Sequence, residues 1–241
     1  RVLFRSIAKA FWPGPVTLLL NKADDANTVV TGGLDTIGIR MPAHPVFSTL
    51  LEASGMAVAA PSANPYKKLS PTSAVHVINS LEGKIAAVLD GGDCHHGLES
   101  TIIDLTQTPF RVLRSGPISA KQLADVLGEE VLTPTSHSAA VPGNVTSHYQ
   151  PNTRVRLVSV DDLSSKPELK VACLHYSAIE PHDNIVSINM PKDVAQYAHD
   201  LYRTLNDADK LGCDEIWVER PPLTEDWVAV HDRLNRAQSK L

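Results

Sequence analysis

The stretch FWPGPVTLLL, residues 11–20, constrains the fold of this chain more than any other part of its sequence. Pro13 and Pro15 each fix φ and remove a backbone donor, so a helix that arrives through residues 7–11 has to end there. The run that follows, residues 16–20, is apolar without strict alternation. This is the pattern of a strand covered on both faces, although a run this short also fits a buried helical segment. The sequence therefore predicts a turn and then a central strand.

Strand-like runs alternate with helical signals over the rest of the first 130 residues. The other apolar runs cover residues 36–40, 56–60, 85–89, 101–105 and 111–113. Three helices are indicated by residues at their ends. One would start at Pro45 and stop at Gly55, and another would be capped by Ser70 with Pro71 in its first turn. The third would start with a capping box of Ser119 and Gln122 and end at Gly128. This alternation predicts a mixed α/β domain over residues 1–130.

Two further parts follow this domain. Residues 131–151 are rich in Pro, Ser, Thr and Gly, which is typical of a linker. Beyond them, strand-like runs and amphipathic helices alternate again: strands at 155–158, 171–174, 185–188 and within DEIWVERPP, and helices at 194–211 and 226–237. Residues 152–241 are therefore predicted to form a second α/β domain around a small, mostly parallel sheet.

Composition limits the classes of protein and partner. With 241 residues, 43% of them hydrophobic, the chain can bury two cores, and its net charge of −5 argues against a general nucleic-acid coat. Three widely spaced cysteines fit a reducing compartment, and no apolar run approaches the roughly 20 residues of a membrane span. We expect a cytoplasmic protein with no membrane partner. Because the chain opens on Arg1 inside a helix-like stretch, we also expect an N-terminal piece to be absent.

Four loops with polar or small residues follow the strand-like runs: RMPAHP, PSAN, DGGDCHHGLEST and RSGP. Loops beyond strand ends are where α/β proteins bind ligands, so these four predict one composite pocket. Its side chains suit an anionic ligand, with positive charge and hydrogen-bond donors from Arg40, Arg114, Ser62, Asn64, Ser100 and Thr101. The alternative stays open that the two arginines pair with Asp35 or Glu99 and that the loop glycines only turn the chain.

Other kinds of site fit the sequence less well. GLEST has the wrong spacing for a nucleophile elbow and APSAN lacks its glycines, so a serine hydrolase is disfavoured. DCHH, residues 93–96, has no second pair of ligands at zinc-site spacing and fits a solvated loop better. TGGLD and DGGD match neither the dinucleotide fingerprint nor the P-loop.

Taken in order, the motifs FWPGPVTLLL, IGIRMPAHPV, VAAPSANPYKKLSPTSAVHV, VLDGGDCHHGLESTIIDL and VLRSGPIS strongly resemble the YrdC/Sua5 family of threonylcarbamoyl-AMP synthases. VPGNVTSHYQP is similar to the linker of the longer Sua5 form, and YAHDLYRTLNDADKLGCDEIWVERPP is similar to its C-terminal domain. The resemblance covers nearly the whole chain. It implies an α/β protein in which a YrdC-like twisted mixed sheet is followed by a small Rossmann-like α/β domain.

The resemblance also implies an activity. Such enzymes are nucleotidyltransferases that make L-threonylcarbamoyladenylate from L-threonine, bicarbonate or CO2, and ATP with Mg2+, and release pyrophosphate without a covalent protein nucleophile. A separate transferase then uses the product to form t6A at adenosine 37 of tRNA. The residues implied for threonine are Arg40 and Ser100; those implied for ATP are Ser62, Asn64, Arg114 and, from a linker that covers the cavity, His148 and Tyr149. The resemblance assigns no residue to a metal, and it leaves direct tRNA binding open.

Two departures from the family pattern stand out. Family members carry Ser-Gly where this chain has Tyr66 and Lys67, and their N-terminal Lys-x-Arg segment and upstream threonine pocket precede the WPGP motif. Two other functions stay open: a noncatalytic RNA-binding module, and a carbamoyl transferase that acts on another acceptor. For residues 152–241 we expect a scaffold or regulatory role, with Cys173, His175 and Cys213 as core or surface residues rather than ligands.

Overall fold

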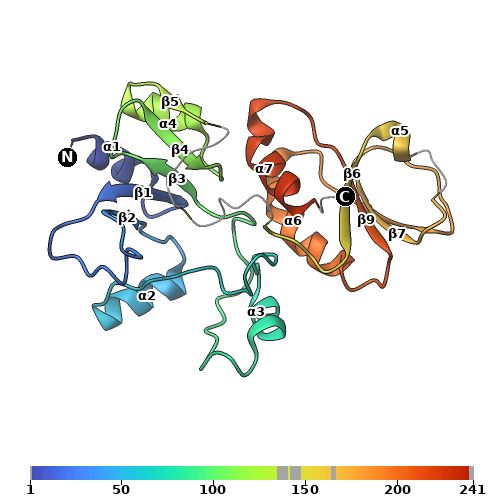
Figure 1. The fold of residues 1–241 in the computed structure, drawn as a ribbon, viewed down its shortest axis with the longest axis horizontal. Helices are drawn as coiled ribbons and strands as arrows, with labels where there is room; N and C mark the ends of the chain where they lie inside the picture. The colour runs from blue at the N-terminus through green and yellow to red at the C-terminus, as the bar shows by residue number, and fades with distance from the viewer. Residues whose placement is uncertain (1, 135–140, 142–147, 164–166, 239–241) are drawn as a thin grey trace. The chain divides into compact units, whose positions relative to one another are not determined.

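The computed structural model describes residues 2–134, 141, 148–163 and 167–238 (Figure 1). The chain forms two compact units. The N-terminal unit consists of residues 1–61 and 99–144, and the C-terminal unit consists of residues 62–98 and 145–241. Segment 62–98 therefore belongs structurally with the C-terminal half of the chain, although it lies between two pieces of the N-terminal unit in the sequence.

The N-terminal unit contains a mixed five-stranded sheet in the order β2-β1-β3-β4-β5. Its strands are β1 (Val16–Asn21), β2 (Thr36–Ile39), β3 (Thr101–Asp104), β4 (Phe110–Arg114) and β5 (Val131–Leu132). The interior strand β1 runs parallel to β3 and antiparallel to β2, so the sheet is mixed, as predicted.

Side chains on both faces of β1 are buried, which confirms the buried strand predicted for residues 16–20. On one face, Val16 and Leu18 pack with Ile7 of α1 (Val2–Phe11) and Leu123 of α4 (Ala120–Leu127). On the other face, Leu19 packs with neighbouring strand residues. The chain turns between α1 and β1 at Gly14, where an added Cβ would lie 2.2 Å from the carbonyl oxygen of Phe11, so only glycine fits there.

The helix ends in this unit follow the local signals. Helix α4 begins with the predicted capping box, in which the Ser119 side chain accepts from the Gln122 amide and the Gln122 side chain accepts from the Ser119 amide. Gly128 ends it with a φ of 70°. Helix α2 (Pro45–Ser54) likewise stops at Gly55, whose φ is 63°. These short-range predictions are confirmed.

Two predicted strands and one predicted helix start are wrong. Residues 56–60 and 85–89 are irregular, and Met56 and Leu89 are each 63% exposed. A strand needs a hydrogen-bonded neighbour, and in the described part of the chain no strand lies alongside either segment. Helix α3 (Ala74–Leu81) begins after Ser73, which caps it, rather than at Ser70. Ser70 is buried in the extended chain that precedes the helix.

The C-terminal unit contains a four-stranded, wholly parallel sheet in the order β6-β9-β7-β8, as predicted. Its strands are β6 (Arg154–Val158), β7 (Val171–His175), β8 (Ile185–Asn189) and β9 (Glu215–Glu219). Helices α6 (Val194–Ala208) and α7 (Val228–Ala237) cover one face, and the short helix α5 (Val160–Leu163) lies on the other (Figure 1). The turn η1 (Glu225–Trp227) leads into α7.

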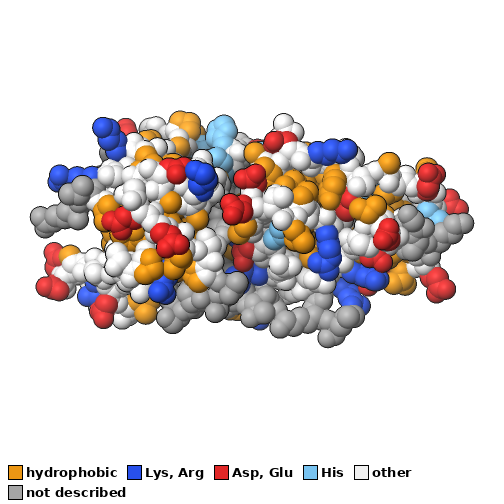
Figure 2. Space-filling view, turned by 90° about the horizontal axis from the view of Figure 1, so that it is seen from above, with side chains coloured by type: hydrophobic (Ala, Val, Ile, Leu, Met, Phe, Trp, Pro, Cys, Tyr) orange, Lys and Arg blue, Asp and Glu red, His pale blue; other side chains and the backbone are white. Residues whose placement is uncertain are grey.

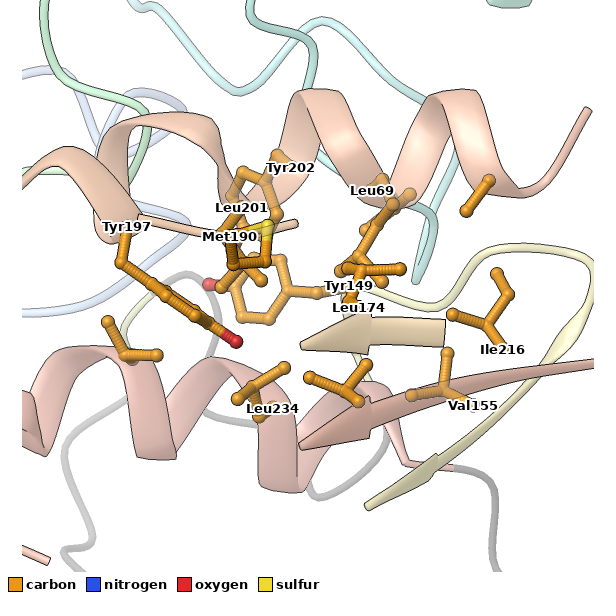
Figure 3. Packing of buried hydrophobic residues seen from close by; sticks show 14 of the residues in the cluster. Leu69, Tyr149, Val155, Leu174, Met190, Tyr197, Leu201, Tyr202, Ile216 and Leu234 are labelled. Carbon is orange, nitrogen blue, oxygen red and sulfur yellow. The ribbon is translucent and has the colours of Figure 1, made fainter. Parts of the chain in front are cut away.

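Segment 62–98 and the end of the linker contribute to the core of this unit. Leu69 and Tyr149 belong to the same buried cluster as residues of α6 and α7 (Figure 3). Leu98 is a member of the same cluster. Cys173 and Cys213 are buried, and burial raises the pKa of the Cys173 thiol to about 12. No helix in the described ranges is long and apolar enough to cross a bilayer.

Candidate functional site

The strand register of the N-terminal unit brings several predicted site residues to one end of its sheet. Arg40 follows β2 directly, Ser100 precedes β3, and Arg114 ends β4. In the sheet, Val16 of β1 is paired with Thr101. The antiparallel strands β2 and β4 therefore end at the same edge at which β1 and β3 begin.

Ser100 is the centre of a polar cluster at this edge. Its side chain is only 7% exposed, and its Oγ lies 2.8 Å from Oγ1 of Thr17. Arg114 donates from Nη2 to Ser100 Oγ and from Nε to the Ser100 carbonyl oxygen, at 3.0 Å each. A fixed positive charge thus lies against a serine whose hydroxyl is held in place. The sequence analysis missed Thr17 because it lies within the apolar run of β1.

Close backbone packing holds this cluster in place. Gly116 follows Arg114 by two residues, and a Cβ added to it would lie 2.5 Å from the Glu99 carbonyl oxygen and from the Thr101 amide nitrogen. Thr101, fully buried, donates its hydroxyl to the Ile118 carbonyl at 2.7 Å and accepts from the Ile118 amide at 3.1 Å. The RSGP loop and the start of β3 therefore form one rigid piece.

Arg40 is a solvent-exposed cation at the same edge. The Gly14 amide donates to the Met41 carbonyl at 2.9 Å, which ties the loop of Arg40 to the WPGP turn. Desolvation by the surrounding protein lowers the pKa of Arg40, but a guanidinium stays charged at neutral pH. Arg40 makes no ion pair with any carboxylate of the described residues, Asp35 included, so its charge is available to an anion.

Residues 62–64 of the PSAN loop lie in the C-terminal unit, and Ser62 is exposed. Asn64 is held locally: its amide donates to the Ser62 carbonyl at 3.0 Å, and its Nδ2 donates to the carbonyls of Pro65 and Lys68 at 3.1 and 3.0 Å. Its Oδ1 is buried and has no hydrogen-bond partner among the described residues. Asn64 therefore presents an unused acceptor, suited to a hydroxyl or amino group.

Lys67 occupies a backbone conformation that favours glycine. Its φ is 68°, and its carbonyl accepts from the Gln150 amide at 2.9 Å, so the loop is fixed in this shape. Replacing Lys67 with glycine is expected to raise the free energy of unfolding by about 0.5–1 kcal/mol, because the relief of strain exceeds the entropy that glycine adds to the unfolded chain. Urea unfolding measures this difference. A Lys67→Ala variant, which keeps the strain, is the matched control, and it should gain nothing.

His148 and Tyr149 end the predicted linker and dock on the C-terminal unit. The His148 amide donates to the Arg236 carbonyl at 3.2 Å, and its ring lies 6.3 Å from that of Tyr66. Tyr149 is 2% exposed and stacks on Tyr202, with ring centroids 5.5 Å apart (Figure 3). Tyr149, which the sequence predicted to contact the nucleotide, is thus a core residue of this unit. Residues 135–140 and 142–147 of the linker lie outside the described residues.

The DCHH segment makes protein contacts that do not resemble a metal site. Asp93 pairs with Arg203, and the Cys94 carbonyl lies 3.1 Å from the His199 ring. Across the described ranges, no three His, Cys, Asp or Glu side chains gather to hold an ion. In the second domain, His175 is buried, and its two ring nitrogens lie 2.7 Å from the Ser177 carbonyl and from the Ser187 hydroxyl.

Comparison with known proteins covers both halves of the chain. Residues 2–116 match a family model described as "Telomere recombination" (Sua5_yciO_yrdC), and residues 118–239 match one described as "Threonylcarbamoyl-AMP synthase, C-terminal domain". The chain is 36% identical to the threonylcarbamoyl-AMP synthase of Pyrococcus abyssi over 96% of its own length and 72% of the relative. It is 32% identical to that of Schizosaccharomyces pombe, over 98% of this chain and 66% of the relative.

Solved structures agree with the sequence comparison. The crystal structure of P. abyssi Sua5 complexed with L-threonine superposes with a TM-score of 0.85 at 35% identity, covering 98% of this chain and 74% of that one. A P. abyssi Sua5 variant in which a neighbouring His and Tyr are replaced by alanine gives a TM-score of 0.84 at 34% identity, with 98% and 73% coverage. The mixed α/β fold therefore extends over both units.

Proposed function

Because the chain belongs to the YrdC/Sua5 family of threonylcarbamoyl-AMP synthases, we propose that it joins L-threonine, bicarbonate or CO2, and ATP into L-threonylcarbamoyladenylate and releases pyrophosphate. The observation that supports this most directly is the Ser100 cluster. A buried hydroxyl and a fixed guanidinium lie at the end of the sheet, in a chain whose solved relative binds L-threonine. The cluster offers positive charge and hydrogen bonds without an activated nucleophile.

The substrate roles follow from the chemistry of each side chain. Arg40, an exposed cation that pairs with no carboxylate of the described residues, suits the threonine carboxylate, and Ser100 with Thr17 suits its polar groups. The carbamate oxygen of N-carboxythreonine then attacks the α-phosphorus of ATP. One phosphorus–oxygen bond forms, the bond to the β-phosphate breaks, and pyrophosphate carries away the electron pair. Arg114 supplies positive charge where negative charge develops, so the protein contributes position and electrostatics.

ATP is assigned to Ser62, Asn64, Arg114 and His148, with Tyr149 as the buried anchor beside His148. Asn64 supports this assignment with its unused acceptor, and His148 with its position at the end of the linker. Tyr149 reaches a nucleotide only by leaving the core. When bound, Mg2+ neutralises phosphate charge. The described residues gather no carboxylate set for it, so we assign it no protein ligand and expect it to arrive with ATP.

We also propose that a separate transferase consumes the product in the cytoplasm. An adenylate is an activated acyl donor, and the transferase uses it to form t6A in tRNA. Direct RNA binding by this chain has little electrostatic support. Its net charge is −5, and acidic and basic side chains are interspersed on the face shown in Figure 2.

The test is pyrophosphate release by the purified full-length protein with ATP and Mg2+, with L-threonine and bicarbonate each present or omitted. Release is expected only when both are present, and mass spectrometry should identify the adenylate. Release that requires another amine in place of threonine would favour the carbamoyl transferase. Salt-sensitive RNA binding without any release would favour the RNA-binding module.

A further inference from the structure

Strand β2 places a glycine on the face of the N-terminal sheet that carries the candidate site. Val16 and Leu18 of β1 pack with helices α1 and α4. Thr17 and Leu19 alternate with them along the strand and therefore point to the opposite face. Gly38 of β2 is paired with Leu19, and residues directly opposite each other on neighbouring strands share a face. Gly38 therefore lies on the same face as Thr17.

The two arginines of the candidate site belong to this face as well. Ile102 of β3 is paired with Thr17 on one side and with Arg114 of β4 on the other, so these three residues form one row across the sheet. Arg40 is two residues beyond Gly38, the spacing of side chains that share a face of a strand. Thr17 thus occupies a strand between those of Arg40 and Arg114.

The side chain of Thr17 presents its hydroxyl and its methyl group to different neighbours. Its Oγ1 lies 2.8 Å from the Ser100 hydroxyl, and its Cγ2 faces the position that a side chain on Gly38 would occupy. The bond between the two hydroxyls uses one of their two protons, so the other can be donated to a ligand. A ligand at this place therefore meets a hydrogen-bonding group and an apolar group on one residue.

The backbone does not require glycine at residue 38. Gly38 is not one of the described residues with a positive φ, and its pairing with β1 is regular. A Cβ added to it would lie 3.4 Å from Thr17 Cγ2, an ordinary packing distance, and Gly38 is exposed. Glycine inside a strand costs stability and often marks a place where a ligand approaches the backbone. The space above Gly38 is therefore suited to a ligand.

We propose that the space above Gly38 receives the side-chain methyl group of L-threonine, and that Gly38 and Thr17 together set a preference for threonine over serine. The two amino acids share the hydroxyl, which Thr17 and Ser100 can bind, and they differ only in this methyl group. The Thr17 methyl supplies the apolar contact, and the absent side chain at residue 38 supplies the room. The inference rests on the proposed function, because it takes L-threonine as the substrate.

Kinetics with the two amino acids test the role of Gly38, with pyrophosphate release by the full-length protein as the readout. One methyl group in a binding site is worth about 10- to 200-fold, so the parent should prefer threonine to serine by a kcat/KM ratio in that range. Gly38→Ala should lower the kcat/KM for threonine at least about tenfold and that for serine less than about threefold. Its melting temperature should not fall, because alanine restricts the unfolded chain and can adopt this backbone conformation.

Two substitutions of Thr17 separate its hydroxyl from its methyl group. Thr17→Ser keeps the hydroxyl, so only the preference for threonine should fall, by about three- to fivefold for one buried methyl group. Thr17→Val keeps the shape and removes the hydroxyl, so the kcat/KM should fall about five- to tenfold for both amino acids. Thr36→Ser is the matched control: it removes the same methyl group from the far end of β2 and should change neither value.

Binding without ATP distinguishes failure of this inference from failure of the proposed function. Threonine and serine are titrated calorimetrically into the parent and into Gly38→Ala. If the parent releases no pyrophosphate but its binding preference for threonine falls in Gly38→Ala, the proposed function is wrong and the role of Gly38 is supported. Threonine-dependent release with a parent-like preference in Gly38→Ala would overturn the role of Gly38 alone. A parent that binds neither amino acid would overturn both, and Thr17→Ser decides by the same criterion if Gly38→Ala does not fold.

Discussion

Arg114→Ala is expected to lower threonine-dependent pyrophosphate release by about 10²- to 10³-fold, the range seen when one preorganised donor is removed from an active site. The Arg114 guanidinium contacts Ser100 directly, with bonds of 3.0 Å to its hydroxyl and to its carbonyl. Alanine removes both the charge and the restraint on Ser100. Steady-state kinetics measure the loss, and circular dichroism checks that the fold persists.

Two further variants separate these contributions. Arg114→Lys keeps the charge but lacks the rigid planar fork that reaches both the hydroxyl and the carbonyl of Ser100, so an intermediate loss of about tenfold is expected. Ser100→Ala keeps Arg114 and removes the hydroxyl shared with Thr17, so it should raise the KM for threonine more than it lowers kcat. Parent-like kinetics in Arg114→Ala would contradict the assignment of this cluster to the reaction.

Local signals in the sequence predicted most of the secondary structure. The capping box at Ser119, the helix stops at Gly55 and Gly128, and the buried run of β1 each depend on residues within one or two turns of chain. The parallel sheet of the C-terminal unit followed from strict alternation of strands and helices. Such features are decided by neighbours in sequence, which a single sequence displays.

The errors concern features that depend on distant parts of the chain. Residues 56–60 and 85–89 have strand composition, but a strand forms only where a partner's backbone groups face it. Ser70 has capping chemistry, yet its burial places the helix start at Ser73 instead. The attachment of segment 62–98 to α6 was equally invisible, because Leu69 and Leu98 look like ordinary apolar residues in the sequence.

The sequence predicted the residue types of the candidate site but not the hydrogen bonds between them. Arg114 and Ser100 were assigned to neighbouring loops, and the structure shows them in direct contact. Whether an arginine donates to a serine or to a ligand depends on register between strands, here the pairing of Arg114 with Ile102. Thr17 carried no signal, since a threonine in an apolar strand is ordinary β composition.

Tyr149→Ala is expected to lower the free energy of unfolding of the C-terminal unit by about 3–5 kcal/mol, the usual cost of deleting a buried aromatic ring. The ring is 2% exposed, stacks on Tyr202, and lies 5.2 Å from the guanidinium of Arg233. The Arg233 side chain is fully buried beside Asp232, so the variant also leaves a buried cation next to a cavity. Urea unfolding followed by the fluorescence of Trp217 and Trp227 measures the change.

His148→Ala is the matched comparison because it alters the neighbouring linker residue. The His148 side chain is only half-buried, so its loss should cost under about 1 kcal/mol of stability. The variant should instead weaken ATP binding, because His148, unlike Tyr149, can contact a nucleotide without leaving the core. Should Tyr149→Ala keep the parent's stability while losing nucleotide affinity, the ring would belong to the nucleotide site in solution. We expect the opposite result, in which Tyr149→Ala loses stability and His148→Ala loses ATP affinity. Tyr149 would then anchor the end of the linker in the core, and this anchor would hold the adjacent His148 against the nucleotide.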